Sequence, residues 1–209
     1  MYGNRWVASS SGVYHSDSHE PTSSSNFSTS TNRLSVASST YDSAGNQTYF
    51  APYALTFDAE NRLTEAESAS NGNAYYAYDG DGRRVAKSWT PNGGSEVLTY
   101  YIYDIAGRLA AEYSDGDPGD PGRAYVFTDL LGSVRAVTDD AGNVEECYDF
   151  LPFGRMLTTS DNGRSSVGCY PSSPAGYTSD LGEKFTGQQR DEILLDYFIA
   201  RYYSGGQGR

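Results

Sequence analysis

The chain has 209 residues, enough for one ordinary domain or two small ones, and its 27 acidic and 15 basic residues give a net charge of −12. Phosphate binding needs basic residues, so this charge argues against nucleic acid and anionic membrane surfaces as partners. No segment approaches the roughly 18 apolar residues of a membrane span, and the first six residues lack the apolar core of a signal peptide. We therefore expect no nucleic-acid partner and no membrane span.

Aliphatic residues are scarce, because Leu, Ile, Val and Phe together make up 34 of the 209 residues. Such a fraction with a high net charge is typical of disordered chains. The 19 tyrosines argue for order, since disordered chains are poor in aromatics and each ring can bury on the order of 150–250 Å². We expect an ordered protein with walls of tyrosine.

Residues 1–31 are rich in Ser and Thr and are predicted to form a weakly ordered leader. They contain both histidines, His15 and His19, at a spacing that chelates metals on helices. The segment has no apolar face to support a helix, so we expect no metal site and no cofactor.

A short unit recurs from residue 32 onward: an aromatic residue, Asp, two variable residues, Gly and a polar or basic residue. Asn61 takes the place of Gly in one copy, which fits because Asn is the other residue that tolerates positive φ. Seven copies within about 110 residues exceed what chance explains. The residues assigned to these repeat turns are Tyr41, Asp42, Gly45, Phe57, Asp58, Asn61, Tyr78, Asp79, Gly82, Tyr103, Asp104, Gly107, Asp129, Gly132, Asp139, Gly142, Tyr148, Asp149 and Gly154.

Each unit is predicted to be the tip of a β-hairpin. The Asp side chain accepts backbone N–H bonds from residues further along the turn, and Gly supplies the left-handed conformation that closes it. Strands are expected on both sides, for example over 99–103 and 109–113, where tyrosine occupies both faces of the first strand. The predicted fold is all-β: antiparallel hairpins stacked into an open, twisted sheet that forms part of a shell.

Four segments follow from this pattern: the leader 1–31, the repeat hairpins 32–116, an acidic Pro/Gly loop 117–124, and the C-terminal segment 125–209. The run Asp79-Gly80-Asp81-Gly82 is superficially similar to a calcium loop, but the later Glu that such a loop needs is missing. We therefore interpret Asp79 and Asp81 as turn-forming residues and not as calcium ligands.

The two cysteines, Cys147 and Cys169, are separated by 22 residues, a distance compatible with a disulfide. Of the two readings we favour two unpaired thiols, because spacing alone does not establish a bond.

The C-terminal segment contains the most specific sequence motifs of the chain. Tyr148-Asp149-Phe150-Leu151-Pro152-Phe153-Gly154 is followed after an insert by Phe185-Thr186-Gly187-Gln188-Gln189-Arg190-Asp191, and then by a run from Leu195 to Tyr203. These motifs resemble the RHS repeat-associated core domain, and the upstream units resemble the tyrosine-aspartate (YD) repeats that precede it. The resemblance covers 32–209, and its core-motif residues are Pro152, Phe153, Phe185, Gly187, Asp191, Leu195, Tyr197, Arg201, Tyr202 and Tyr203.

This resemblance implies a function. In that family, arrays of repeats wind into a hollow all-β shell around a variable C-terminal polypeptide, often a toxin, and the core domain closes the shell. It implies as partners the remainder of the same shell, the enclosed polypeptide and an immunity protein for it, and it implies secretion or a cell-surface location. Many members also cut themselves just beyond the core by an aspartyl-protease type of reaction.

This sequence departs from the family pattern at two places. Ile193 and Leu194 stand where the family has a small residue and glycine, so the segment 191–203 is expected to be strand, with a helix as the alternative. The acidic motif associated with self-cleavage does not follow Gly208-Arg209. We therefore expect no independent enzyme activity. Arg201 has two readings: it orients a carboxylate, or, as we favour, it packs between tyrosines or pairs with a turn aspartate.

A second function remains open, because exposed tyrosines stack on sugar rings and would suit a carbohydrate-binding or adhesion module. A sheet with open edges is also expected to be marginally stable or to self-associate.

Overall fold

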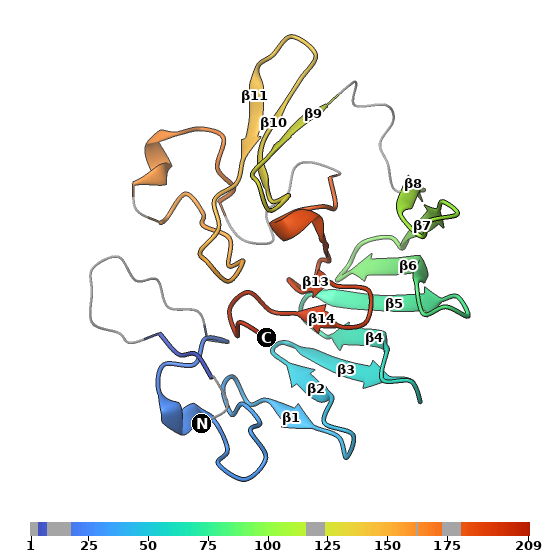
Figure 1. Cartoon of the computed structure of the whole chain (residues 1–209), viewed down its shortest axis with the longest axis vertical. Coiled ribbons are helices and arrows are strands. Elements are labelled where there is room, and N and C mark those ends of the chain that lie inside the picture. The colour runs from blue at the N-terminus through green and yellow to red at the C-terminus, as the bar shows by residue number, and fades with distance from the viewer. Residues whose placement is uncertain (1–3, 8–17, 116–123, 162, 173–180) are drawn as a thin grey trace. The chain divides into compact units, whose positions relative to one another are not determined.

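The computed structural model describes residues 4–7, 18–115, 124–161, 163–172 and 181–209 (Figure 1). All regular structure in these residues is β-strand or short 3₁₀-helix, so the all-β prediction is confirmed. The chain forms two compact units, which are described separately. The first consists mainly of Pro21–Asp117, and the second mainly of Pro118–Phe198 with Tyr202–Arg209.

The first unit contains an eight-stranded antiparallel sheet whose strands pair in the order in which they occur along the chain. Each strand is therefore joined to its neighbour by a short turn, as the repeats predict (Figure 1). The strands are β1 (Thr40–Tyr41), β2 (Gln47–Phe50), β3 (Tyr53–Phe57), β4 (Leu63–Ser68), β5 (Gly72–Tyr78), β6 (Arg84–Pro91), β7 (Val97–Tyr103) and β8 (Leu109–Ser114).

Side chains along β3, β5 and β7 alternate between a more buried and a more exposed face, as the pleat requires. In β7, Tyr101 is 5% exposed whereas its neighbour Tyr100 is 48% exposed, which places tyrosine on both faces as expected. Tyr113 of β8 lies opposite Tyr100 and is 66% exposed. Phenol rings suit this position because the ring packs while the hydroxyl reaches water.

Before the sheet, the 3₁₀-helix η1 (Ser24–Asn26) leads into a small core of three residues, Phe27, Leu34 and Val36. Tyr41 connects this core to the sheet, because its hydroxyl accepts a hydrogen bond of 3.1 Å from the Leu34 backbone N–H.

The second unit contains two three-stranded antiparallel sheets. One has the order β11-β10-β9 and the other the order β12-β13-β14. Four residues, Val134, Val137, Tyr148 and Met156, form a buried cluster against which Phe150 and Leu181 pack. The elements are β9 (Tyr125–Thr128), β10 (Val134–Thr138), β11 (Val144–Cys147), η2 (Arg164–Ser166), η3 (Phe185–Gly187), β12 (Gln189–Arg190), β13 (Asp196–Tyr197) and β14 (Tyr202–Tyr203).

The segment 191–203 contains β13 and β14 and no helix, in line with the strand expectation. The predicted acidic loop 117–124, apart from residue 124, lies outside the described residues, as do His15 and much of the leader. Among the residues that the structure describes, no helix combines the length and apolarity needed to cross a membrane.

Candidate functional site

Six of the seven aspartates assigned to repeat turns occupy the same position in the same turn. In each, the Asp backbone N–H donates to the carbonyl four residues later, and the residue three positions after Asp donates its N–H back to the Asp carbonyl. For Asp104 the two distances are both 2.9 Å, to Arg108 and from Gly107. The residue three positions after Asp has positive φ in every copy, +76° at Gly107 and +61° at Asn61. The six aspartates are Asp42, Asp58, Asp79, Asp104, Asp129 and Asp139.

The Asp side chain completes each turn, because one of its oxygens accepts backbone N–H bonds from the following residues. Oδ1 of Asp104 accepts from Ala106 and Arg108, each at 2.9 Å. The backbone hydrogen bond from Arg108 lowers the pKa of Asp104, and the side-chain bond from Asn143 likewise lowers the pKa of Asp139. These carboxylates are held ionised as structural acceptors, which leaves them poorly suited to proton transfer.

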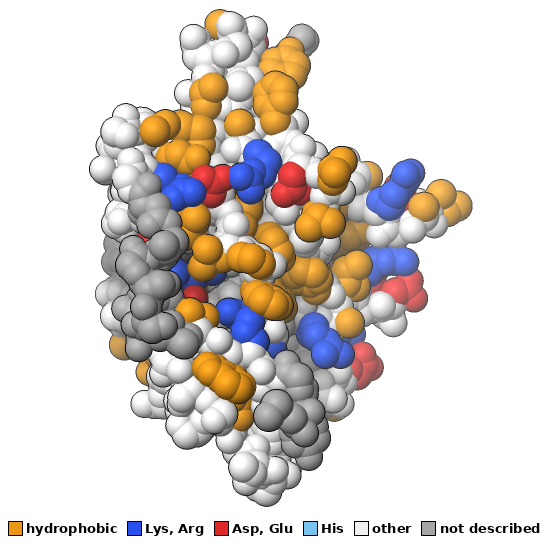
Figure 2. Space-filling model, turned by 60° about the vertical axis from the view of Figure 1, so that its left-hand side comes forward, with side chains coloured by type: hydrophobic (Ala, Val, Ile, Leu, Met, Phe, Trp, Pro, Cys, Tyr) orange, Lys and Arg blue, Asp and Glu red, His pale blue; other side chains and the backbone are white. Residues whose placement is uncertain are grey.

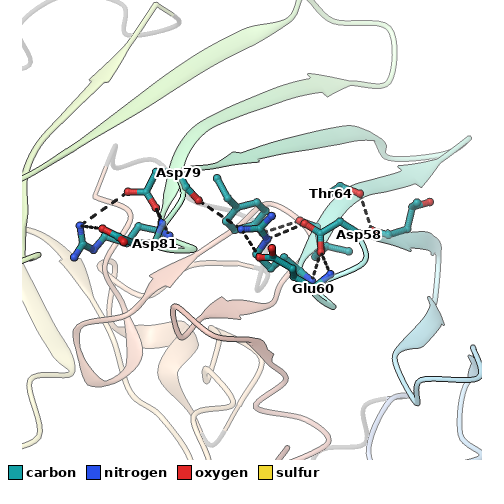
Figure 3. Close-up of polar contacts among 10 residues, drawn as sticks. Asp58, Glu60, Thr64, Asp79 and Asp81 are labelled. Carbon is teal, nitrogen blue, oxygen red and sulfur yellow. Dashed lines mark hydrogen bonds and ion pairs between the residues drawn. The ribbon is translucent and has the colours of Figure 1, made fainter.

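An arginine that follows the positive-φ residue of a turn couples that hairpin to the next one, and this coupling was not predicted from the sequence. The Arg62 guanidinium carbon lies 5.1 Å from the centre of the Tyr78 ring in the next unit, while Arg62 Nε donates to Asp58 at 2.7 Å. Tyr78 in turn donates its hydroxyl to the Leu63 carbonyl at 2.6 Å. Figure 3 shows this arrangement at the corners of Asp58 and Asp79, with Glu60 and Asp81 beside them.

The same contacts recur one unit later. Arg83 lies 5.9 Å from the centre of the Tyr103 ring, and Tyr103 donates to the Arg84 carbonyl at 2.8 Å. Arg83 also packs so closely on Gly107 that a Cβ there would lie 2.9 Å from its Nη2. Earlier in the chain, Arg33 lies 5.3 Å from the centre of the Tyr41 ring. We call these repeated contacts of Arg33, Arg62 and Arg83 the arginine–tyrosine ladder.

The ladder ends at Arg108, whose side chain is 81% exposed. The next repeat begins with Thr128 in place of an aromatic residue, so it offers no ring to stack on. Figure 2 shows one face of the molecule, on which basic side chains lie beside acidic and hydrophobic ones. A different arginine, Arg84, is fully buried, lies 4.6 Å from the centre of the Tyr101 ring and donates to the Tyr101 hydroxyl at 3.1 Å.

The Tyr148 unit differs from the predicted turn. Here Leu151 takes the Asp position: its N–H donates to the Arg155 carbonyl, and the Gly154 N–H donates to the Leu151 carbonyl, both at 2.8 Å. Asp149, assigned to the turn from the sequence, lies two residues outside it. The Leu151-Pro152 sequence explains the shift, because Pro favours the first inner position of such a turn.

Because Asp149 lies outside the turn, its carboxylate is available to bind three side chains. Arg164 donates to its Oδ2 through Nη2 at 2.7 Å, Tyr170 donates to the same oxygen at 2.9 Å, and Arg135 forms an ion pair with Oδ1. Burial raises the pKa of Asp149, but the hydrogen bonds from Arg164 and Tyr170 and the charge of Arg135 outweigh it, so the net shift is downward. We call Asp149, Arg135, Arg164 and Tyr170 the Asp149 clamp.

Cys147 and Cys169 form a disulfide, so the expectation of two unpaired thiols is wrong. Their Cα atoms lie 5.1 Å apart, and the Cys147 N–H donates to the Cys169 carbonyl at 2.8 Å. The spacing of the two cysteines was not enough to predict this bond, because an irregular loop between them brings the two residues together.

The C-terminal sequence motifs come together around Arg190. This residue was not among the core-motif residues predicted from the sequence. Arg190 forms a two-pronged ion pair with Asp196 at 2.6 and 2.8 Å and donates to the Gly154 carbonyl at 2.9 Å. Gly154 is required here for a second reason, because a Cβ on it would lie 2.5 Å from the Phe185 ring. Tyr203 adds a third link by donating to the Phe153 carbonyl at 3.0 Å.

Asp191 is buried and forms a turn of the repeat type, with hydrogen bonds of 3.0 Å to the Leu195 carbonyl and 2.9 Å from the Leu194 N–H. Leu194 has a φ of +65°, so the turn is kept although its glycine is lost. The other core-motif residues divide by exposure: Leu195 and Tyr197 are buried, Phe185, Tyr202 and Tyr203 are half-buried, and Pro152, Phe153, Gly187 and Arg201 are exposed. Arg201 is exposed, and its packing between tyrosines or pairing with a turn aspartate stays a prediction.

Lys184 is another buried cation of this unit. Its Nζ lies 4.6 Å from the centre of the Tyr148 ring and donates to the Leu181 carbonyl. Burial lowers the pKa of Lys184 to about 8, although the charge of Glu146 acts in the opposite direction. Burial also raises the pKa of Asp196, against the charge of Arg190. These groups therefore contact neighbouring segments of the same unit.

No protein-family model and no curated protein sequence matches this chain. Solved structures do match. The chain is similar to the crystal structure of TcdB2-TccC3, with 18% identity and a TM-score of 0.55 over 81% of this chain and 9% of that one. It is also similar to the Photorhabdus luminescens Tc holotoxin pore carrying a TccC3 variant, with 18% identity and a TM-score of 0.57 over 88% of this chain and 10% of that one.

A third similar structure is TcdB2-TccC3 without its hypervariable C-terminal region, with 18% identity and a TM-score of 0.53 over 81% of this chain and 9% of that one. At this level of identity, the likeness shows a shared fold. The chain spans about a tenth of the length of these neighbours.

Proposed function

We propose that this chain is a wall segment of an RHS/YD-repeat shell that encloses a variable C-terminal polypeptide. The arginine–tyrosine ladder is the observation that carries the proposal. It joins the Asp58 hairpin to the Asp79 hairpin, and the Asp79 hairpin to the Asp104 hairpin, through contacts of one kind, so a longer wall is built by repeating this unit. A wall with such a repeat needs no ligand site of its own.

The solved structures support this proposal. Their shared fold with this chain comes from proteins named as parts of a Tc toxin, and one is described without a hypervariable C-terminal region. The enclosed partner of this chain would be a region of that kind, often a toxin, and an immunity protein would be the further partner.

The proposed role is structural, without independent catalysis by this chain. Six aspartates serve as turn acceptors, and Asp149 and Asp196 are bound by arginines. Aspartyl-type self-cleavage would then belong to the full-length protein. A secreted or cell-surface location is also proposed, and the Cys147–Cys169 disulfide supports it because such bonds persist in oxidising compartments.

The experiment is a protease-protection assay on the natural full-length protein. Its C-terminal polypeptide should resist a protease that rapidly digests the same polypeptide expressed alone. Replacing Arg62 and Arg83 by Ala should open the wall and expose the tail, whereas Arg108→Ala, at the exposed end of the ladder, should not. A tail that is digested at the same rate with and without the wall would contradict enclosure.

One observation favours a second candidate, carbohydrate binding. Tyr75, Tyr100 and Tyr113 are 42%, 48% and 66% exposed, and Tyr100 and Tyr113 are cross-strand neighbours on one face. Rings presented in this way stack on sugars. A glycan array probed with the chain and with a Tyr100→Ser/Tyr113→Ser variant tests this: hits that the variant loses would favour binding, and an array without hits would remove it.

A further inference from the structure

The disulfide and the Asp149 clamp fasten the same loop. Cys147 ends β11, and the chain returns 22 residues later to Cys169. Asp149 follows Cys147 by two residues, and the clamp residues Arg164 and Tyr170 lie just before and just after Cys169. One covalent bond and one ionic cluster therefore hold the two ends of the loop together.

Backbone hydrogen bonds extend this closure on both sides of the disulfide. The Cys147 N–H donates to the Cys169 carbonyl at 2.8 Å, and the Thr159 N–H donates to the Pro171 carbonyl at 2.9 Å. Within the loop, Met156 is 1% exposed and packs with Val134 and Val137. Opening the loop would therefore loosen the core of this unit as well as its surface.

Both cysteine residues are half-buried rather than fully buried. Asp149 is held by Arg135 on β10 as well as by Arg164 and Tyr170 in the returning segment. When the covalent bond is cut, the polar contacts remain but must hold the loop alone. Contacts of partly exposed ion pairs are weak without a preorganising link.

We propose that the Cys147–Cys169 bond is a thiol-cleavable fastening that keeps the described residues between the two cysteines, 148–161 and 163–168, closed in an oxidising compartment and releases them in a reducing one. The reductant is a small thiol of the glutathione class. One thiolate attacks a cysteine sulfur, the Cys–Cys bond breaks, a mixed disulfide forms, and the departing thiolate takes up a proton. A second thiol resolves the mixed disulfide, so two thiols are oxidised to one disulfide and two cysteine thiols are formed. This proposal is independent of the enclosure proposal.

Trypsin digestion of the full chain tests the fastening, because Arg164 is a cleavage site inside the loop whose side chain is bound by Asp149. The chain is incubated with or without reduced glutathione, digested briefly, alkylated and analysed by mass spectrometry. Reduction should raise cleavage after Arg164 by roughly a hundredfold, the effect expected of removing a crosslink of this length. Cleavage after Arg62 and Arg83 in the eight-stranded sheet should stay unchanged.

Variants separate the covalent link from the ionic one. Cys147→Ser/Cys169→Ser should show fast cleavage after Arg164 that glutathione no longer changes. Asp149→Asn keeps the disulfide, so it should show a smaller increase and still respond to glutathione. Arg108→Ala serves as the matched control, because that side chain is exposed and lies in the other unit.

Two results would overturn the proposal. In one, alkylation shows both cysteines reduced while cleavage after Arg164 stays slow. In the other, reduction accelerates cleavage after Arg62 and Arg83 as much as after Arg164, which would make the disulfide a general stabiliser of the whole chain. Failure of tail protection in the full-length protein would leave these digestion results unaffected, so the two proposals fail separately.

Discussion

The eight-stranded sheet and the C-terminal unit both have few aliphatic residues to bury, and they are stabilised by different kinds of contact. The sheet repeats one modest contact, an arginine over the tyrosine of the next hairpin. The C-terminal unit uses a few different links, each made once: a disulfide, the Asp149 clamp and the buried Arg190–Asp196 pair. Stability in the sheet should therefore be spread over many residues, whereas in the C-terminal unit it should depend on a few.

The largest expected effect is at Asp196, which is 1% exposed. Asp196→Ala leaves the buried Arg190 charge without its carboxylate, and we expect a loss of about 3–5 kcal/mol in the free energy of unfolding. Denaturant unfolding, localised by hydrogen exchange, measures it. The double variant Arg190→Met/Asp196→Leu should lose less, because no buried charge remains, and an equal loss in both would contradict this account.

The next largest effect on the free energy of unfolding is expected at two adjacent leucines, Leu194 and Leu195. Leu195→Gly removes a buried side chain and should cost about 3 kcal/mol or more. Leu194→Gly should cost about 2 kcal/mol less, because Leu194 is half-buried and its positive φ is strained for any residue with a Cβ. Thermal unfolding of the two variants compares them, and equal losses would show that the turn is not strained at Leu194.

In the sheet, single substitutions should have smaller effects. Arg83→Ala removes the contact with the Tyr103 ring and the ion pairs with Asp79 and Asp81, for an expected loss of about 1 kcal/mol. Arg108→Ala should change stability by less than about 0.5 kcal/mol, since that side chain is exposed. A larger loss at Arg108 than at Arg83 would refute the ladder.

Raising the pH should stabilise the two regions in two different pH windows. Asp42 and Asp104 have lowered pKa values in the fold, so their stabilisation is complete above the unfolded value of 3.8 and is lost as the pH falls through the lower folded values. Lys184 has a folded pKa of about 8 against 10.5 unfolded, so stability should rise from about pH 8 to pH 10.5. A pH series of unfolding curves checks both windows. Lys184→Met should abolish the alkaline rise alone.

The smallest effect on the free energy of unfolding is expected for substitutions of exposed tyrosines that promote self-association. Among the described residues, β8 has a strand neighbour on one side only, and Tyr113 on it is largely exposed. Tyr100→Ser/Tyr113→Ser should reduce association at high concentration while leaving the unfolding free energy nearly unchanged. Sedimentation velocity checks this, and a compact wild-type monomer at high concentration would contradict it.

The sequence was sufficient for the hairpin turns, because Asp and Gly act on their own local backbone and the pattern repeats. It predicted the strands around Tyr103 for the same reason. It was not sufficient for the contacts between units, since Arg62 and Tyr78 are joined only after the strands have paired. Asp149 was misplaced because Leu151-Pro152 forms the turn instead, and the disulfide was missed because an irregular loop brings Cys147 and Cys169 together.

The order of the eight-stranded sheet has a consequence for biosynthesis. Every strand after β1 pairs with the one made just before it, so the pairing partner of each new strand has already been synthesised. No hairpin depends on a part of the sheet that has yet to be translated. Such a wall can lengthen from one end during translation, and the gene can gain or lose a hairpin without disturbing the order of those already laid down.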